Sequence, residues 1–431
     1  MKQITKTFFI LLSLCFTASL SAQNVQSFTV NGLKVIFKQN TANDIISANM
    51  YYRGGVTNLT EDNAGLEALT LVVSTKASIN YPKDKLNEAL ESMNSVISSN
   101  SNFDYSQISL LYVKQNFVKS WEIFSDIVVN PSLAEDDLVL EREKMINNVK
   151  QVNDDPDAYL QKLVNNQFYV DHPYSVEVNG TVSTLSSFST DDLSAYHSEL
   201  MNTSRLLLVV VGNTTKSELE AMVKKSFGNL PVGNYAASHP PAVEFSEPSI
   251  KIVKKENPTT YIQGTYSAPA RGTEEGYTML IANSILRDRV FEEVRTKRSL
   301  SYAPSTRYVN RFSSYGGIYV TAVDPDTTIE VMVNELQKMK DELIPEKDLK
   351  NKIRQFLTFY YLGQETNQTQ ANSLAVAELS GIGYNEIDNF IEHVNKVSAA
   401  DIQNVAEKYM KNLQFVLIGN PELLNVNTYM Y

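Results

Sequence analysis

The stretches STDDLSAYHSELMNTSRLLLVVVGN at residues 189–213 and SAADIQNVAEKYMKNLQFVLIGN at residues 398–420 repeat one design. Each opens with a serine that can cap a helix and an acidic first turn, continues as a polar amphipathic helix, and ends in an apolar strand stopped by Gly-Asn. The spacing from Gly212 to Gly419, about 200 residues, is too long for a solenoid repeat and is typical of two consecutive domains. We therefore predict an internally duplicated chain.

A proline-rich segment separates the two halves. PVGNYAASHPPAVEFSEPS at residues 231–249 has four prolines and no sustained periodicity, which is typical of a linker. The predicted domains are residues 23–231 and 250–431, joined by a linker at residues 232–249. Each half begins with alternating strands (residues 28–39 and 249–255), continues through helical stretches and ends in a strand. This order predicts two α+β domains, each a mainly antiparallel sheet with helices packed on one face.

The first residues have the pattern of a secretory signal peptide. Lys2 and Lys6 precede an apolar run at residues 8–14, and small residues end at Ala22, where we predict cleavage. The run is too short for a membrane span, which needs about 20 apolar residues. Lipid attachment at Cys15 is a weaker alternative, because Leu14 stands where such signals need a small residue.

Cleavage would remove the only cysteine, so the mature chain would form no disulfide and use no thiol chemistry. It would also remove Lys2 and Lys6 and take the formal net charge from −11 to −13. Such an acidic chain is a poor partner for nucleic acid.

The stretch NAGLEALTLVVSTKAS at residues 63–78 resembles the active-site helix of the insulinase/pitrilysin family of metallopeptidases. In that family Gly-Leu-x-His-x-x-Glu-His is followed by an apolar pair and Lys-Gly-Thr. Alignment on Gly65 and Lys76 places the two zinc-binding histidines and the catalytic glutamate on side chains with no lone pair and no exchangeable proton. These degenerate metal-site positions are Ala68, Leu71 and Val72.

A second stretch, LEREKMINNVKQVNDDPDAY at residues 140–159, resembles the family's helix with the third zinc ligand. Counting back from Asp155 and Pro156 places that ligand at Asn148, whose amide is a poor zinc ligand. The register of this alignment is open by a position or more, and Glu141 and Glu143 are nearby. The resemblance implies that this chain binds no metal of its own.

The four histidines, His172, His197, His239 and His393, are scattered and no two stand at ligand spacing. His172 is predicted to be a turn histidine whose ring is satisfied by the backbone. The plainer interpretation of residues 65–78 is a buried core helix with Leu66, Leu69 and Val73 at helical spacing.

In the second half, VFEEVRTKRSLSYAPST at residues 290–306 resembles a family signature with an arginine and a tyrosine seven residues apart. Here the pair is Arg295 and Tyr302. In the family these side chains reach across a chamber and hold the substrate backbone, and both can donate hydrogen bonds to a peptide carbonyl that develops negative charge. The alternative is that Arg295 is one charge on a solvated helix and Tyr302 a residue of an amphipathic strand.

The resemblance covers nearly the whole mature chain, and implies that its two domains form half of a clam-shell chamber. Some bacterial members split the work between a metal-bearing chain and a chain with only the Arg/Tyr pair. We therefore expect a non-catalytic subunit of a zinc-dependent peptidase heterodimer, exported to the periplasm, with zinc in the homologous partner and peptides as substrates. The alternative is a peptide-binding or scaffold pseudopeptidase. An independent hydrolase is disfavoured, since no Gly-x-Ser-x-Gly elbow is present.

Overall fold

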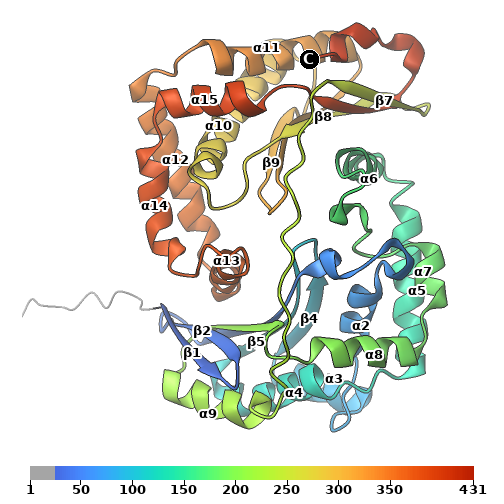
Figure 1. The fold of residues 1–431 in the computed structure, drawn as a ribbon, viewed down its shortest axis with the longest axis vertical. Coiled ribbons are helices and arrows are strands. Elements are labelled where there is room, and N and C mark those ends of the chain that lie inside the picture. The colour runs from blue at the N-terminus through green and yellow to red at the C-terminus, as the bar shows by residue number, and fades with distance from the viewer. Residues whose placement is uncertain (1–24) are drawn as a thin grey trace, which may run out of the picture.

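The computed structural model describes residues 25–431, which form two halves, each built on one sheet (Figure 1). The signal peptide predicted at residues 1–22 lies outside the described residues. No helix of residues 25–431 is both long and apolar enough to cross a membrane.

The first half contains a six-stranded sheet in the order β1-β2-β6-β3-β5-β4. Every neighbouring pair is antiparallel except β2 and β6. Its strands are β1 (Val25–Val30), β2 (Leu33–Gln39), β3 (Ile45–Arg53), β4 (Val96–Ser101), β5 (Tyr105–Val113) and β6 (Leu206–Gly212). Its helices are α2 (Leu66–Ser74), α3 (Lys83–Ser92), α4 (Phe117–Val129), α5 (Glu135–Gln151), α6 (Pro156–Phe168), α7 (Val182–Ser187), α8 (Thr190–Leu200) and α9 (Lys216–Phe227).

The second half contains a five-stranded sheet in the order β7-β11-β8-β10-β9, in which only β7 and β11 are parallel. Its strands are β7 (Ser249–Lys254), β8 (Thr260–Ser267), β9 (Ser305–Val309), β10 (Tyr315–Ala322) and β11 (Gln414–Gly419). Its helices are α10 (Glu274–Val290), α11 (Pro325–Asp341), α12 (Glu346–Gly363), α13 (Asn367–Leu379), α14 (Glu386–Lys396) and α15 (Ala399–Tyr409). The predicted α+β class and mainly antiparallel sheets are confirmed.

The duplicated stretches form α8 with β6 and α15 with β11. The Ser189 and Ser398 hydroxyls each cap their helix by accepting from the N–H of an aspartate three residues later. The carboxylate of that aspartate accepts in return from the serine N–H. One strand prediction needs refinement. Residues 28–39 form a hairpin that turns at Asn31 and Gly32, both with positive φ.

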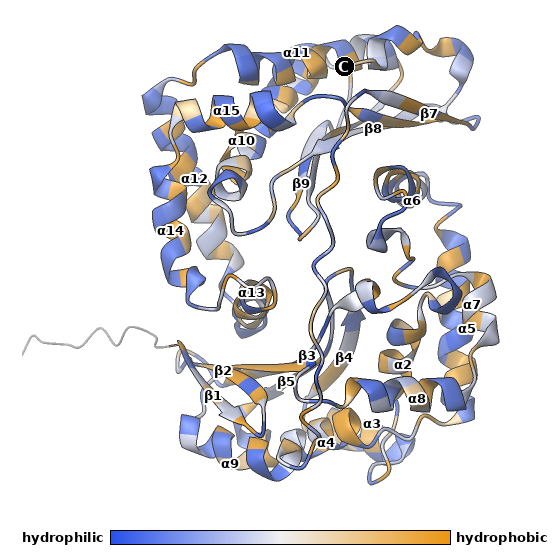
Figure 2. Cartoon of the chain, in the orientation of Figure 1, coloured by the Kyte–Doolittle hydropathy of each residue, from blue (hydrophilic) through white to orange (hydrophobic). Residues whose placement is uncertain are grey.

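The two halves exchange one helix each. On β6, Leu206, Leu208 and Val210 face the helices of the first half, whereas Leu207, Val209 and Val211 pack against α13 from the second half. On β11, Val416 and Ile418 pack in the same way against α6 from the first half. Figure 1 shows α6 beside the second sheet and α13 beside the first. The central strands are therefore covered on both faces, which explains their unbroken apolar sequences (Figure 2).

Residues 231–248 have neither helix nor strand, and they run along both halves. At one end the Ser204 hydroxyl accepts from the Tyr235 N–H, and at the other Asn412 donates to the Phe245 carbonyl. The Phe245 ring also contacts Phe168 of α6, with ring centroids 5.1 Å apart. The segment is thus held against both halves by specific contacts.

Candidate functional site

The helix that resembles the family's active-site helix is α2. It begins after Gly65, whose φ is +85° and whose Cβ, if present, would lie 2.6 Å from the Cα of Gly180. Only glycine allows this backbone conformation and this close approach. Ala68 and Leu71 are buried and Val72 is half-buried, so α2 is a core helix in the part of the chain that the structure describes.

The helix α5 runs antiparallel to α2. Glu141 of α5 lies 3.5 Å from Lys76, just beyond the C-terminal end of α2. Asn148, two turns further along α5, lines a pocket of about 430 Å³ together with Gly180, which packs beside the start of α2. Asn148 therefore lies towards the N-terminal end of α2, where Ala68 also stands.

The residues at these four positions do not fit a zinc ion. Ala68, Leu71 and Val72 have alkyl side chains, and Asn148 offers only an amide. The nearby Glu141 is committed to Lys144 (2.7 Å) and Lys76. Across residues 25–431, no three His, Cys, Asp or Glu side chains are grouped so that they could hold a metal ion.

A buried ion pair beside these positions was not predicted from the sequence. Glu67 is only 2% exposed, and its carboxylate accepts from the Arg205 guanidinium at 2.8 Å, from the Tyr196 hydroxyl at 2.6 Å and from the Ser106 hydroxyl. Burial raises the pKa of Glu67, and the positive charge of Arg205 opposes that rise. The signal available in the sequence was an acidic residue inside an otherwise apolar helix, which must find a partner.

The four histidines make separate contacts. His172 accepts from the Tyr174 N–H at 3.0 Å and contacts the Pro241 carbonyl at 2.9 Å, as predicted for a turn histidine. His197 contacts the Val128 carbonyl at 2.9 Å. Burial lowers the pKa of both rings. The other two lie elsewhere: His239 stacks edge-on with Phe312, and His393 lies beside Glu274.

Arg295 and Tyr302 lie together on the surface of the second half. Arg295 is in a π-helical turn (Phe291–Thr296) that continues α10, and the chain reverses at Ser299, whose φ is +54°. The reversal places the centroid of the Tyr302 ring 4.1 Å from the Arg295 guanidinium carbon, within the range of a cation–π contact. Tyr302 is 79% exposed and precedes β9, so the alternative assignment to a strand is wrong.

Three of the neighbouring charges, Glu293, Lys297 and Arg298, pair with one another and not with Arg295. Glu293 bonds Lys297 at 2.6 Å and also Arg298, and these two cations lower the pKa of Glu293 to about 2. Within residues 25–431, the Arg295 side chain donates no hydrogen bond and has no carboxylate within ion-pair distance. Half-buried Arg295 and exposed Tyr302 therefore offer unused donors to another molecule.

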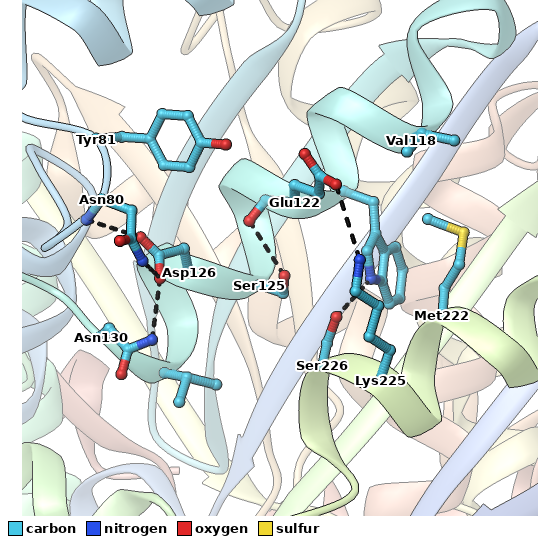
Figure 3. Close-up of a pocket in the computed structure, with 12 residues that line it drawn as sticks. Asn80, Tyr81, Val118, Glu122, Ser125, Asp126, Asn130, Met222, Lys225 and Ser226 are labelled. Atoms are coloured by element: carbon cyan, nitrogen blue, oxygen red, sulfur yellow. Dashed lines mark hydrogen bonds and ion pairs between the residues drawn. The ribbon is translucent and has the colours of Figure 1, made fainter.

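A pocket of about 410 Å³ between α4 and α9 lies on the outer side of the first half (Figure 3). Its polar groups already bond one another. The Asp126 carboxylate accepts from Ser78, Asn80 and Asn130, and the Trp121 indole donates to the Ser226 hydroxyl at 3.0 Å. This pocket therefore presents few free groups for chemistry.

Comparison with known proteins agrees with this fold. A curated "Uncharacterized zinc protease" of Rickettsia felis is 22% identical over 399 residues, covering 91% of this chain and 96% of the relative. The structure described as the peptidase M16 inactive domain from Pseudomonas fluorescens superposes with a TM-score of 0.84 at 16% identity, covering 92% of this chain and 98% of that one. The first half of the periplasmic protease PqqL from Escherichia coli superposes with a TM-score of 0.77 at 13% identity, covering 94% and 95%.

Two family models match consecutive parts of the sequence. Residues 34–182 match the model described as insulinase, peptidase family M16, and residues 187–356 match the model described as the peptidase M16 inactive domain. Together they span most of both halves, and the chain belongs to the insulinase (M16) family of peptidases.

Proposed function

We propose that this protein is the non-catalytic subunit of a zinc-dependent peptidase heterodimer. The observation that supports it most is a contrast within one chain. Helix α2 has no ligating side chain at Ala68, Leu71 and Val72, whereas a half-buried Arg295 without an ion-pair partner lies on the exposed Tyr302 ring. In this proposal the chain binds no cofactor, and zinc belongs to a homologous partner subunit.

The chemistry that remains to this chain is hydrogen-bond donation. When a peptide carbonyl is attacked, its oxygen gains negative charge, and a guanidinium and a phenol stabilise that charge if they are already in place. The stack on Tyr302 holds the plane of Arg295 while leaving its N–H groups at the edge free to donate. Loss of one such donor typically lowers the rate by about 100- to 1,000-fold in other hydrolases.

We further propose that the mature chain works in the periplasm, after removal of residues 1–22, and that its substrates are peptides. The signal-peptide pattern and the likeness to a protease described as periplasmic support that location. The partner would face this chain so that Arg295 and Tyr302 complete its site.

The test is capture of the tagged mature chain from its own cells, followed by identification of bound proteins, zinc analysis and a peptidase assay. We expect a zinc-bearing M16 homologue in about equal amount and peptidase activity only in the complex. Capture of this chain alone, free of zinc and inert towards peptides, would reject the heterodimer and favour a scaffold pseudopeptidase.

A further inference from the structure

The duplication gives the second half a counterpart of the pocket at the degenerate metal site. The pocket in the first half lies between α5, α6 and the loop before α7, and a second pocket, of about 330 Å³, lies between α12, α13 and the start of α14. α5 and α12 hold the same place in the order of the two halves, as do α6 and α13. Gly272 also packs against Ile382 before α14, as Gly65 packs against Gly180 before α7.

The two pockets differ in their linings. The first is mixed: apolar side chains from α5 lie beside polar ones, namely Asn148, Gln161, Lys162, Asn165, Glu177 and Asn179. The second is lined mainly by aromatic and aliphatic side chains, namely Tyr277, Phe356, Tyr360, Val376, Ile387 and Phe390. Binding pockets for small molecules typically have a volume of about 300–1,000 Å³, an apolar lining and a few polar groups. The second pocket meets that description.

Two charged side chains, Glu386 and Arg271, also line the second pocket, and their partners differ. Glu386 accepts from the Tyr277 hydroxyl at 2.5 Å and lies 3.5 Å from the His393 ring. Arg271 donates to the Ser380 hydroxyl at 3.2 Å and to the Asn310 carbonyl, and no carboxylate of residues 25–431 lies within ion-pair distance of it. Arg271 therefore has no ion-pair partner among the described residues, whereas the Glu386 carboxylate is held by Tyr277.

The surroundings of Arg271 make its lack of an ion-pair partner costly. Burial lowers the pKa of its guanidinium, and the acid that acts on it most, Asp104, does so through space and is itself bonded to the Tyr174 hydroxyl. A partly buried guanidinium with free N–H groups gains more from an anion than an exposed one, because water screens it less.

We infer that the pocket between α12, α13 and α14 binds a small amphipathic carboxylate, with the apolar body among the aromatic side chains and the carboxylate on Arg271. Two sources share this chemistry, the C-terminal residue of a peptide and a free aryl or aliphatic acid. The site is separate from Arg295 and Tyr302 and requires neither the partner subunit nor zinc.

Binding can be measured on the purified mature chain with N-acetyl-phenylalanine as the ligand and its amide as the uncharged match. At about 0.3 kcal/mol per non-hydrogen atom, the acid is expected to bind with a Kd on the order of 0.5 mM, which titration by NMR detects. The amide is expected to bind about tenfold more weakly.

Two variants test the location independently. Arg271→Gln removes the charge and is expected to weaken the acid about tenfold while leaving the amide unchanged. Val376→Trp places a large side chain in the pocket from a partly exposed position and is expected to abolish binding of both ligands. Arg354→Gln, an exposed position on α12 outside the pocket, is the matched control and should bind as the wild type does.

Equal affinity for acid and amide, unchanged affinity in both pocket variants, or no binding of the acid would each overturn the inference. Circular dichroism of every variant separates lost binding from lost folding.

The source of the bound carboxylate, a peptide C-terminus or a free acid, is distinguished by comparing acetyl-Gly-Gly-Phe with 3-phenylpropionate. Tighter binding of the tripeptide assigns the pocket to peptide C-termini, and equal or tighter binding of phenylpropionate assigns it to free acids.

Discussion

The two halves share strand order, pairing pattern and an exchanged helix, yet they differ in the side chains around their matching pockets. The first half has alkyl side chains at Ala68, Leu71 and Val72 and a buried ion pair of Glu67 and Arg205. The second half has an apolar pocket and the pair of Arg295 and Tyr302 at its surface. The sheet and helix framework tolerates such change because the core depends on apolar burial, while the chemistry depends on a few polar side chains.

The largest effect is expected from introducing zinc ligands at the four positions aligned with the family's metal site. The fourfold variant Ala68→His, Leu71→Glu, Val72→His and Asn148→Glu should bind about one zinc ion per chain, since three ligands and a base would share one site. Metal analysis after dialysis measures this. The same variant with Asn148 left unchanged is the control. Equal zinc content in both would show that the alignment of Asn148 with the third ligand is wrong.

Removal of one partner of the buried ion pair should be the next largest effect. Arg205→Ala leaves the Glu67 carboxylate buried without its cation, and should lower the free energy of unfolding by about 3–5 kcal/mol. Urea denaturation measures this. The control is Lys144→Ala, which removes the exposed Lys144 and leaves Glu141 paired with Lys76. It should lower the free energy of unfolding by less than about 1 kcal/mol.

The double variant Glu67→Leu with Arg205→Met tests whether the stability lost in Arg205→Ala is due to the unpaired charge of Glu67. Replacement of both groups should recover most of the stability lost in Arg205→Ala. If the double variant is as unstable as the single one, the packing of Arg205 between Tyr196 and Tyr235 matters more than its charge.

The exchanged helices should make the halves unfold together. Leu160→Ala on α6 and Leu374→Ala on α13 each truncate a buried side chain that packs against the sheet of the other half. Each should lower the free energy of unfolding by about 2–5 kcal/mol. Leu362→Ala, at an exposed position of α12, should change stability by less than about 0.5 kcal/mol. The single tryptophan, Trp121, reports the first half.

In Leu160→Ala, Trp121 fluorescence and far-ultraviolet circular dichroism should shift to the same lower urea midpoint. Separate midpoints, with the fluorescence transition unchanged, would mean that the second half unfolds by itself.

The smallest effect concerns pH. His172 and His197, both in the first half, have lowered pKa values when folded, so the unfolded chain binds more protons below about pH 6.5. The free energy of unfolding should therefore fall as pH drops from 7 to 5, by on the order of 1 kcal/mol per histidine. His197→Gln should reduce this slope. An unchanged slope would show that other groups cause it.

Local patterns predicted much of this structure. The capping serines and apolar strands of residues 189–213 and 398–420 predicted α8, β6, α15 and β11, because caps and periodicity act within a few residues. The helical spacing of Leu66, Leu69 and Val73 likewise predicted the buried helix α2.

Long-range pairings were beyond the reach of the sequence. Glu67 and Arg205 stand 138 residues apart, and no local pattern joins them. The same holds for the exchange of α6 and α13, because an amphipathic helix does not specify which sheet it covers. The apolar runs of β6 and β11 did indicate cover on both faces, although not its source.

The central claim is that this chain gives Arg295 and Tyr302 to a site in another subunit. The most direct test is the peptidase activity of the captured complex made with Arg295→Ala, compared with Arg298→Ala from the same turn, which pairs with Glu293. We predict that Arg295→Ala assembles normally and loses at least about 100-fold in activity, while Arg298→Ala stays near wild type. Full activity of an assembled Arg295→Ala complex would contradict the claim.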